Sequence, residues 1–85
     1  MITPEQINDA VNRVEFHHFR GTTMTVCCLT LQNGYTVLGK SAAADPAEFD
    51  LNLGMKFARE DADNKVGELL AFVKCEMQKA QAELA

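Results

Sequence analysis

The sequence Asp45-Pro46-Ala47-Glu48-Phe49 opens the stretch that decides the fold. Asp45 is a favoured helix cap, proline is tolerated at the first helical position, and Glu48 stands where a capping box places its acid. After it, apolar residues recur in steps of three and four, which indicates one helical stripe. The stripe consists of Leu51, Met55, Ala58, Ala62, Val66, Leu69, Val73, Met77, Ala80 and Leu84. We therefore predict a helix over residues 46–83.

This predicted helix is too long for the domain that carries it. It would extend about 60 Å at ~1.5 Å per residue, whereas a globular chain of 85 residues is roughly 25 Å across. Repeats of eleven residues along the stripe favour a nearly straight stripe, or a slight right-handed supercoil, over a left-handed heptad seam. We expect a second copy of the chain to cover the far half, so that the protein is a homo-oligomer. The candidate interface residues are Val66, Gly67, Leu69, Leu70, Val73, Met77, Ala80 and Leu84.

Length and composition predict a single domain over residues 1–85 with a small core. The net charge of −4 argues against nucleic acid and anionic membranes as partners. No apolar run approaches the ~20 residues of a membrane span. Three cysteines, two of them adjacent, argue against a disulfide framework and for a reducing cytosol. The first residues lack the basic and apolar regions of a signal peptide, which also favours the cytoplasm.

A second helix start precedes the long helix, at Thr3-Pro4-Glu5-Gln6, where threonine caps and Gln6 closes a capping box. We predict a helix over residues 4–14, which would have one apolar face. Residues 15–20 fit either a short strand or the exit of this helix, and we favour the strand. The apolar face consists of Ile7, Ala10, Val11 and Val14.

Between the helices we predict an antiparallel β-meander, with further strands over residues 23–31 and 35–41, and hence an α+β fold. Asn33-Gly34 favours a two-residue type I′ hairpin. That turn would place Leu29 opposite Leu38. Alternation would then group Cys27, Leu29, Leu31 and Leu38 on one face, and Met24, Val26, Cys28, Tyr35 and Val37 on the other.

The pairs His17-His18 and Cys27-Cys28 invite a metal interpretation. Neighbouring residues of a strand point to opposite faces, so neither pair alone would hold one ion. A mixed site, such as His17 with Cys27, stays open, but we expect no metal and no cofactor. Both cysteines are more typical of small buried hydrophobes.

A corner between the hairpin and the long helix is the candidate site for a ligand or partner, because a helix start offers N–H groups and a positive dipole end. A structural cap by Asp45 and Glu48 would use the same groups, and we favour that interpretation. The residues gathered there are Lys40, Ser41, Asp45, Phe49, Asp50, Lys56 and Arg59.

Further along, the cluster Glu60, Asp61 and Asp63 fits a solvated helix face with pairs four residues apart. Glycines inside a helix cost about 1 kcal/mol each against alanine. We expect Gly54 to contact the sheet. Gly67 would mark either a crossing with a partner helix or a flexible point.

The segments Thr25 to Val37 and Gly39 to Asp50, with the residues that follow, resemble a family of small tailed-phage and prophage proteins named for the gene-49 and gene-66 products of two enterobacterial phages. The most specific part is Ser-x-x-x-Asp-Pro-x-x-Phe-Asp (residues 41–50). The sequence departs from the family pattern near residues 68–72. The resemblance implies a phage or prophage origin and an accessory role inside the infected bacterial cell, and it implies no reaction.

These observations favour a non-enzymatic accessory protein that binds and modulates a host factor, in host takeover or in anti-defence. The alternative is an oligomeric sponge that holds a small nucleotide-like defence signal between subunits. A weaker alternative is nucleic-acid binding through the hairpin, which the net charge of −4 disfavours. No constellation typical of an enzyme stands out in the sequence.

Overall fold

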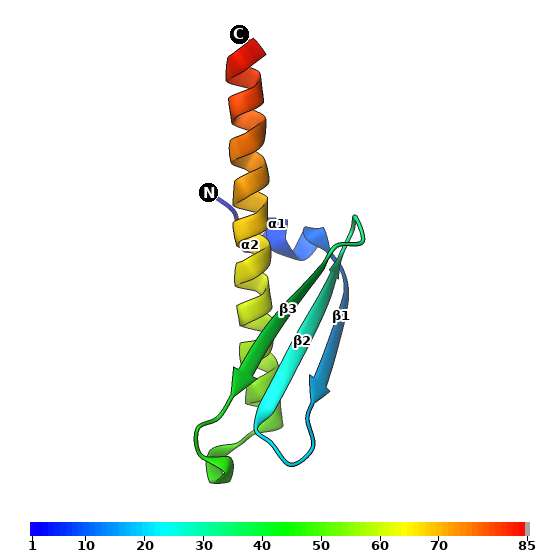
Figure 1. Ribbon diagram of the computed structural model, residues 1–85, viewed down its shortest axis with the longest axis vertical. Helices are drawn as coiled ribbons and strands as arrows, with labels where there is room; N and C mark the ends of the chain where they lie inside the picture. The colour runs from blue at the N-terminus through cyan, green and yellow to red at the C-terminus, as the bar shows by residue number, and fades with distance from the viewer. Residues whose placement is uncertain (85) are drawn as a thin grey trace.

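The computed structural model describes residues 1–84. It shows the α+β fold that the sequence predicted, with a three-stranded antiparallel sheet between a short helix and a long one (Figure 1). The strands follow one another in the sheet in the order β1-β2-β3, which is a meander. The elements are α1 (Pro4–Ala10), β1 (Val11–His18), β2 (Met24–Leu31), β3 (Thr36–Ala42), the 3-10 turn η1 (Pro46–Glu48) and α2 (Leu51–Leu84).

Helix α1 begins as predicted but ends four residues before the predicted position 14. Its Thr3 cap forms the expected capping box with Gln6. At the other end, the Gln32 backbone N–H donates to the Ala10 carbonyl over 2.9 Å. The carbonyl that would continue the helix is therefore used by the end of β2. The β-branched Val11 turns to extended backbone and starts β1, which the sequence had placed only at residues 15–20.

The hairpin between β2 and β3 lies at Asn33-Gly34, but the predicted type I′ turn is wrong. The Gly34 N–H donates to the Leu31 carbonyl over 2.9 Å, and the Leu31 N–H donates to the Tyr35 carbonyl over 2.8 Å. Gly34 has a φ of 89°, and no other residue of the hairpin has a positive φ. A type I′ turn needs positive φ at both central residues, so the loop is instead a type I turn followed by a left-handed glycine.

The longer loop shifts the register by one residue. Leu29 faces Val37 and Cys28 faces Leu38, so the predicted faces of Val37 and Leu38 are exchanged. Val37 lies in the core, whereas Leu38 is 54% exposed on the opposite side. One residue of loop therefore decides which of two neighbouring apolar side chains enters the core.

Helix α2 lies across β2 and β3 and supplies the other layer of the core (Figure 1). Its buried residues are four apart and small, and they are Gly54, Ala58, Ala62 and Val66. They pack on Cys27, Leu29 and the neighbouring sheet residues. Gly54 contacts the sheet as predicted, since a Cβ there would lie 2.8 Å from Thr25 Oγ1. The first half of α2 therefore approaches the sheet very closely.

The predicted helix start at residue 46 is wrong, although the predicted end at 83 agrees with the observed end within one residue. Asp45 caps only the 3-10 turn η1. Phe49 then adopts extended backbone, and Asp50 caps α2 by accepting from the Asn52 N–H over 2.9 Å. At this break the Phe49 ring stacks on His18, with ring centroids 4.8 Å apart.

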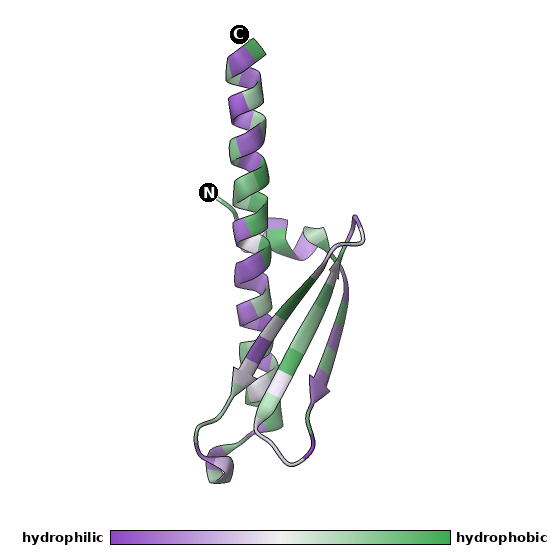
Figure 2. Ribbon diagram, viewed as in Figure 1, coloured by the Kyte–Doolittle hydropathy of each residue, from purple (hydrophilic) through white to green (hydrophobic). Residues whose placement is uncertain are grey.

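The far end of α2 projects beyond the sheet (Figure 1), and the molecule measures 59 × 22 × 18 Å. Residues 71–84, which we call the α2 overhang, are exposed throughout. Hydrophobic and hydrophilic residues alternate along it (Figure 2). The overlong helix inferred from the sequence is therefore present.

Candidate functional site

Only part of the predicted corner comes together. Ser41, Phe49 and Asp50 line one shallow cavity of about 150 Å³ where β3 ends and α2 begins, with Glu48 and Phe57 beside them. Asp45 and Asp50 occupy the backbone N–H groups of η1 and α2. The structural cap that we favoured is therefore present at Asp45, whereas Asp50 is a cap that the sequence analysis did not predict. Both carboxylates fill the place an anion would need.

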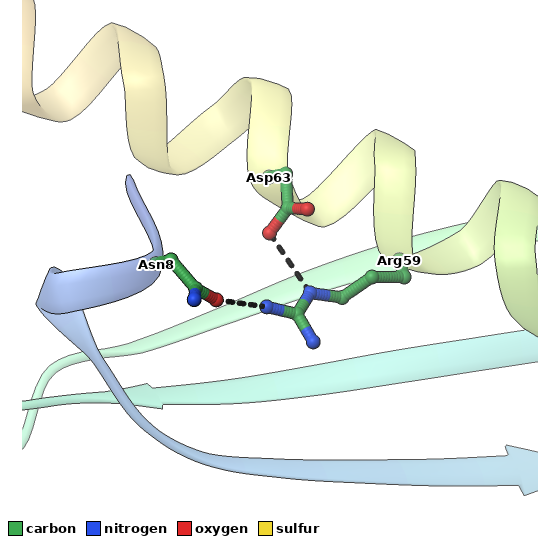
Figure 3. Close-up of polar contacts among 3 residues, drawn as sticks. All are labelled: Asn8, Arg59 and Asp63. Atoms are coloured by element: carbon green, nitrogen blue, oxygen red, sulfur yellow. Dashed lines mark hydrogen bonds and ion pairs between the residues drawn. The ribbon is translucent and has the colours of Figure 1, made fainter. Parts of the chain in front are cut away.

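Arg59 lies away from this corner, in a polar contact between the two helices (Figure 3). Its Nε donates to Asp63 Oδ1 over 2.9 Å, and its Nη2 donates to Asn8 Oδ1 over 3.4 Å. Arg59 and Asp63 belong to α2, and Asn8 belongs to α1. The guanidinium thus joins α1 to α2.

Asp61 and Lys65 do more than the predicted surface pair. Asp61 Oδ2 accepts from the Lys40 backbone N–H over 2.9 Å, and Lys65 Nζ donates to the Leu38 carbonyl over 2.7 Å. The two charged groups are 3.4 Å apart. We call this pair the β3-edge clamp, because both of its backbone partners lie on the outer side of β3. The hydrogen bond from Lys40 and the neighbouring Lys65 ammonium hold the pKa of Asp61 below its usual value.

The histidines take structural positions. His18 Nε2 lies 2.7 Å from the Thr22 carbonyl, and its ring stacks on Phe49. His17 contacts Phe19 edge-on, with centroids 4.6 Å apart. Within residues 1–84, no three histidine, cysteine or acidic side chains lie close enough to share a metal ion.

The three cysteines differ in exposure. Cys27 is buried in the core, Cys28 is half-buried and Cys75 is exposed on the overhang. Burial raises the pKa of the Cys27 thiol, which disfavours the reactive thiolate. Cys27 is therefore the small buried hydrophobe that was expected, and Cys28 is only partly so.

The predicted interface residues fall into two groups. Val66 is fully buried against the sheet of its own chain, so its assignment to an interface between copies is wrong. Gly67 packs near Ile7, whose Cδ1 would lie 3.4 Å from an added Cβ. Leu69 and Leu70 are half-buried beside the core. The members that remain exposed are Val73, Met77, Ala80 and Leu84.

The sequence analysis missed Phe72, which is 65% exposed on the α2 overhang. It lies next to Val73 but about 100° around the helix from it, so a search for a single stripe passes over it. A shallow groove of about 580 Å³ runs beside the same surface, between the N-terminal segment and α2. It is lined by Ile2, Gln6, Asp9, Leu70, Val73, Lys74, Met77, Gln78 and Gln81. Val73 and Met77 therefore belong both to the α2 overhang and to the lining of this groove.

Comparison with known proteins places the chain in a family. No curated protein and no solved structure matches it. Separately, none of the helices within residues 1–84 combines the length and the apolarity needed to cross a membrane. The family model for the phage protein (N4 Gp49/phage Sf6 gene 66) family matches residues 2–77. This match covers the capped N-terminal helix, the meander and most of α2. The chain therefore belongs to the phage protein (N4 Gp49/phage Sf6 gene 66) family.

Proposed function

We propose that the protein is a non-enzymatic phage accessory protein that binds a host protein inside the infected cell and modulates it. The observation that carries the proposal is the α2 overhang. Within it Phe72, Val73 and Met77 are 65%, 51% and 60% exposed, although the chain has a core of its own. Large exposed apolar patches are typical of protein interaction sites.

The geometry of the overhang supports a helix-mediated contact. Val73, Met77, Ala80 and Leu84 lie on one face at spacings of four, three and four, which is the pattern by which an amphipathic helix enters an apolar groove. The charged residues Lys74, Glu76, Lys79 and Glu83 balance one another. The overhang is thus neutral on an acidic protein and carries little long-range repulsion toward other acidic proteins.

The charged side chains that could serve in catalysis form hydrogen bonds that stabilise the fold. Arg59 joins the helices, Asp61 bonds to β3, and Asp50 caps α2. Groups with these partners would have to give up structural bonds to act on a substrate. This assignment of roles favours binding over catalysis.

The experiment compares the wild-type protein with a Val73→Glu, Met77→Glu double variant. Each tagged protein is incubated with extract of the bacterial host, and co-purifying proteins are quantified by mass spectrometry. We expect at least one host protein to be retained by the wild type and reduced at least about tenfold by the variant, because two charges enter the apolar contact.

The matched control is a Cys75→Glu, Ala82→Glu double variant, which adds the same charge to the opposite face of the overhang. Both positions are exposed. It should retain the host protein as the wild type does. Equal retention by all three proteins, or no host protein retained by any, would contradict the proposal.

A further inference from the structure

The two edge strands of the sheet differ in whether side chains bond their outward backbone groups. Directly before β3, the Tyr35 carbonyl accepts from the Leu31 N–H of β2. Backbone bonding alternates along an antiparallel strand, so Leu38 and Lys40 direct their backbone groups outward. These are the groups that the β3-edge clamp holds, through Asp61 on the Lys40 N–H and Lys65 on the Leu38 carbonyl.

The β1 edge has no such cover. The Phe19 N–H donates to the Met24 carbonyl over 3.2 Å, and the register pairs His17 with Val26. By the same alternation, Val14, Phe16 and His18 direct their backbone N–H and carbonyl groups away from β2. Within residues 1–84, no side chain is hydrogen-bonded to the backbone of these three residues. An open strand edge is a template for another strand.

The side chains beside this edge are also incompletely covered. Val14 and Phe16 stand opposite Leu29 and Cys27 in the register, on the face that α2 packs against. Leu29 and Cys27 are fully buried, whereas Val14 and Phe16 remain 36% and 38% exposed. The difference arises because α2 packs on β3 and β2 and has little contact with β1 (Figure 1). Apolar surface and open backbone groups therefore coincide on one strand.

We propose that β1 pairs antiparallel with β1 of a second copy of this chain, joining two three-stranded sheets into one continuous sheet around a two-fold axis. Phe16 lies on the axis, opposite Phe16 of the second copy. In this register Val14 pairs with His18 of the other copy and both strands exchange backbone bonds. The inference concerns a surface other than the α2 overhang and does not rest on the proposed host partner.

Charge selects this register over its neighbours. It sets Glu15 opposite His17 of the second copy, and the reverse, on the outer face. Sliding by one pair toward the N-terminus would set Glu15 against Glu15, which is unfavourable directly across a sheet. Sliding further would centre the contact on Val14 and engage the irregularity between Val11 and Arg13, where the β1 register shifts. Bulges of this kind impede strand pairing.

The covered edge argues for a second copy as the occupant. A dimer joined through β1 has β3 at both outer edges, and the clamp of Asp61 and Lys65 already bonds those backbone groups. Two-fold pairing of one strand with itself is a closed, isologous arrangement. The pairing therefore stops at two chains and leaves both overhangs accessible.

The test measures the mass of the purified full-length protein by light scattering, for wild type and Val14→Pro. Proline removes the outward N–H of Val14 and no bond to β2, and proline is tolerated on an edge strand. We expect the wild type to show twice the chain mass of 9.4 kDa and the variant to show 9.4 kDa. Val14→Ala keeps the N–H and should remain dimeric. Circular dichroism and thermal unfolding check that Val14→Pro is folded.

A second measurement does not depend on a disruptive variant. In a Cys28→Ser, Cys75→Ser background, oxidation should link two chains through Phe16→Cys, because hydrogen-bonded partners lie ~5.5 Å apart at Cα, within disulfide range. Val14→Cys in the same background should stay unlinked, since its own equivalent is about 13 Å along the partner strand at ~3.3 Å per residue.

Several results would overturn the proposal. A wild-type mass of 9.4 kDa rules out pairing of β1 with a second copy. The same holds if the 9.4 kDa protein binds an extended host segment on β1 instead. A dimer that survives Val14→Pro but dissociates in Val73→Glu, Met77→Glu assigns assembly to the overhang, as the sequence analysis expected. Linkage through Val14→Cys instead of Phe16→Cys excludes the register centred on Phe16.

Discussion

The two ends of α2 share one apolar stripe and have opposite environments. From Gly54 to Val66 the side of the helix that faces the sheet is made of small buried residues four apart. From Val73 to Leu84 the stripe consists of Val73, Met77, Ala80 and Leu84, all of which are exposed. Small residues allow the helix axis to come close to the sheet, and the close approach excludes water. The comparison teaches that apolar periodicity alone does not distinguish the half that packs from the half that projects. The packed half differs by its succession of very small residues at Gly54, Ala58 and Ala62.

The strongest way to break the packed half is to add one carbon at Gly39 on β3. A Cβ there would clash with the backbone of Ala58 and Ala62 and lie 2.7 Å from the Ala62 Cβ. We expect Gly39→Ala to destabilise the fold by about 3 kcal/mol or more, measured by urea unfolding. Gly67→Ala is the control, because its Cβ would meet only Ile7 at 3.4 Å. It should be neutral or gain up to about 1 kcal/mol from helix propensity. Equal effects would contradict the close approach at Gly39.

The same substitution in both halves sharpens the comparison. Val66 is fully buried and Val73 is 51% exposed. Val66→Ala should cost about 2 kcal/mol of unfolding free energy through lost burial and a cavity, whereas Val73→Ala should change it by less than about 0.5 kcal/mol. Urea unfolding is done below the concentration at which copies associate. A large effect at Val73 would mean that the overhang packs within its own chain.

The contact between Gly54 and the sheet contains a buried hydroxyl that can be improved. Thr25 is fully buried, and its Oγ1 has no hydrogen-bond partner within residues 1–84. Thr25→Val keeps the shape and should stabilise the protein by about 1 kcal/mol. Thr23→Val should instead cost about 1 kcal/mol, because Thr23 Oγ1 donates to the Ala43 carbonyl over 2.7 Å. The two melting temperatures should move in opposite directions. A shared direction would contradict the unpaired state of Thr25.

The smallest effect concerns the clamp, which ties the packed half to β3. The folded-state pKa of Asp61 is lowered from 3.8. Its charge therefore contributes stability that is present above 3.8 and lost as pH falls through the folded-state pKa. The stability difference between wild type and Asp61→Asn should thus shrink as pH falls from 7 to 3. Urea unfolding at each pH measures this difference. A stability difference that does not change with pH would mean that the charge of Asp61 does not contribute to the clamp.

The sequence determined the kind and order of the elements better than their limits. The Thr3 capping signal located the start of α1, and the apolar stripe located the far end of α2, because both are local features of the sequence. The end of α1 depends on Gln32, which is distant in the sequence and bonds the Ala10 carbonyl. The hairpin register depends on the φ of Asn33, and the Asn-Gly pair fits both loop lengths. These features need tertiary information.

The candidate site was predicted only in part for a similar reason. Ser41, Phe49 and Asp50 are neighbours because a short turn holds them together. Arg59 was grouped with them by proximity in the sequence, yet each helical residue rotates the side chain by ~100°, and Arg59 faces α1. The role of Asp61 and Lys65 could have been inferred from their place beside Ala58 and Ala62, the small residues that bring α2 onto β3.

The adjacent thiols of Cys27 and Cys28 allow the separation of α2 from the sheet to be measured by chemical modification. They are neighbours in the chain, but strand alternation buries the thiol of one and leaves the other half-buried. A thiol reagent should modify Cys28 and Cys75 rapidly in the folded protein. It can react with Cys27 only after α2 separates from the sheet. The modification rate of Cys27 in the folded protein, divided by the rate for an unfolded thiol, is then the equilibrium constant for that separation. It is obtained without denaturant and at any concentration of protein.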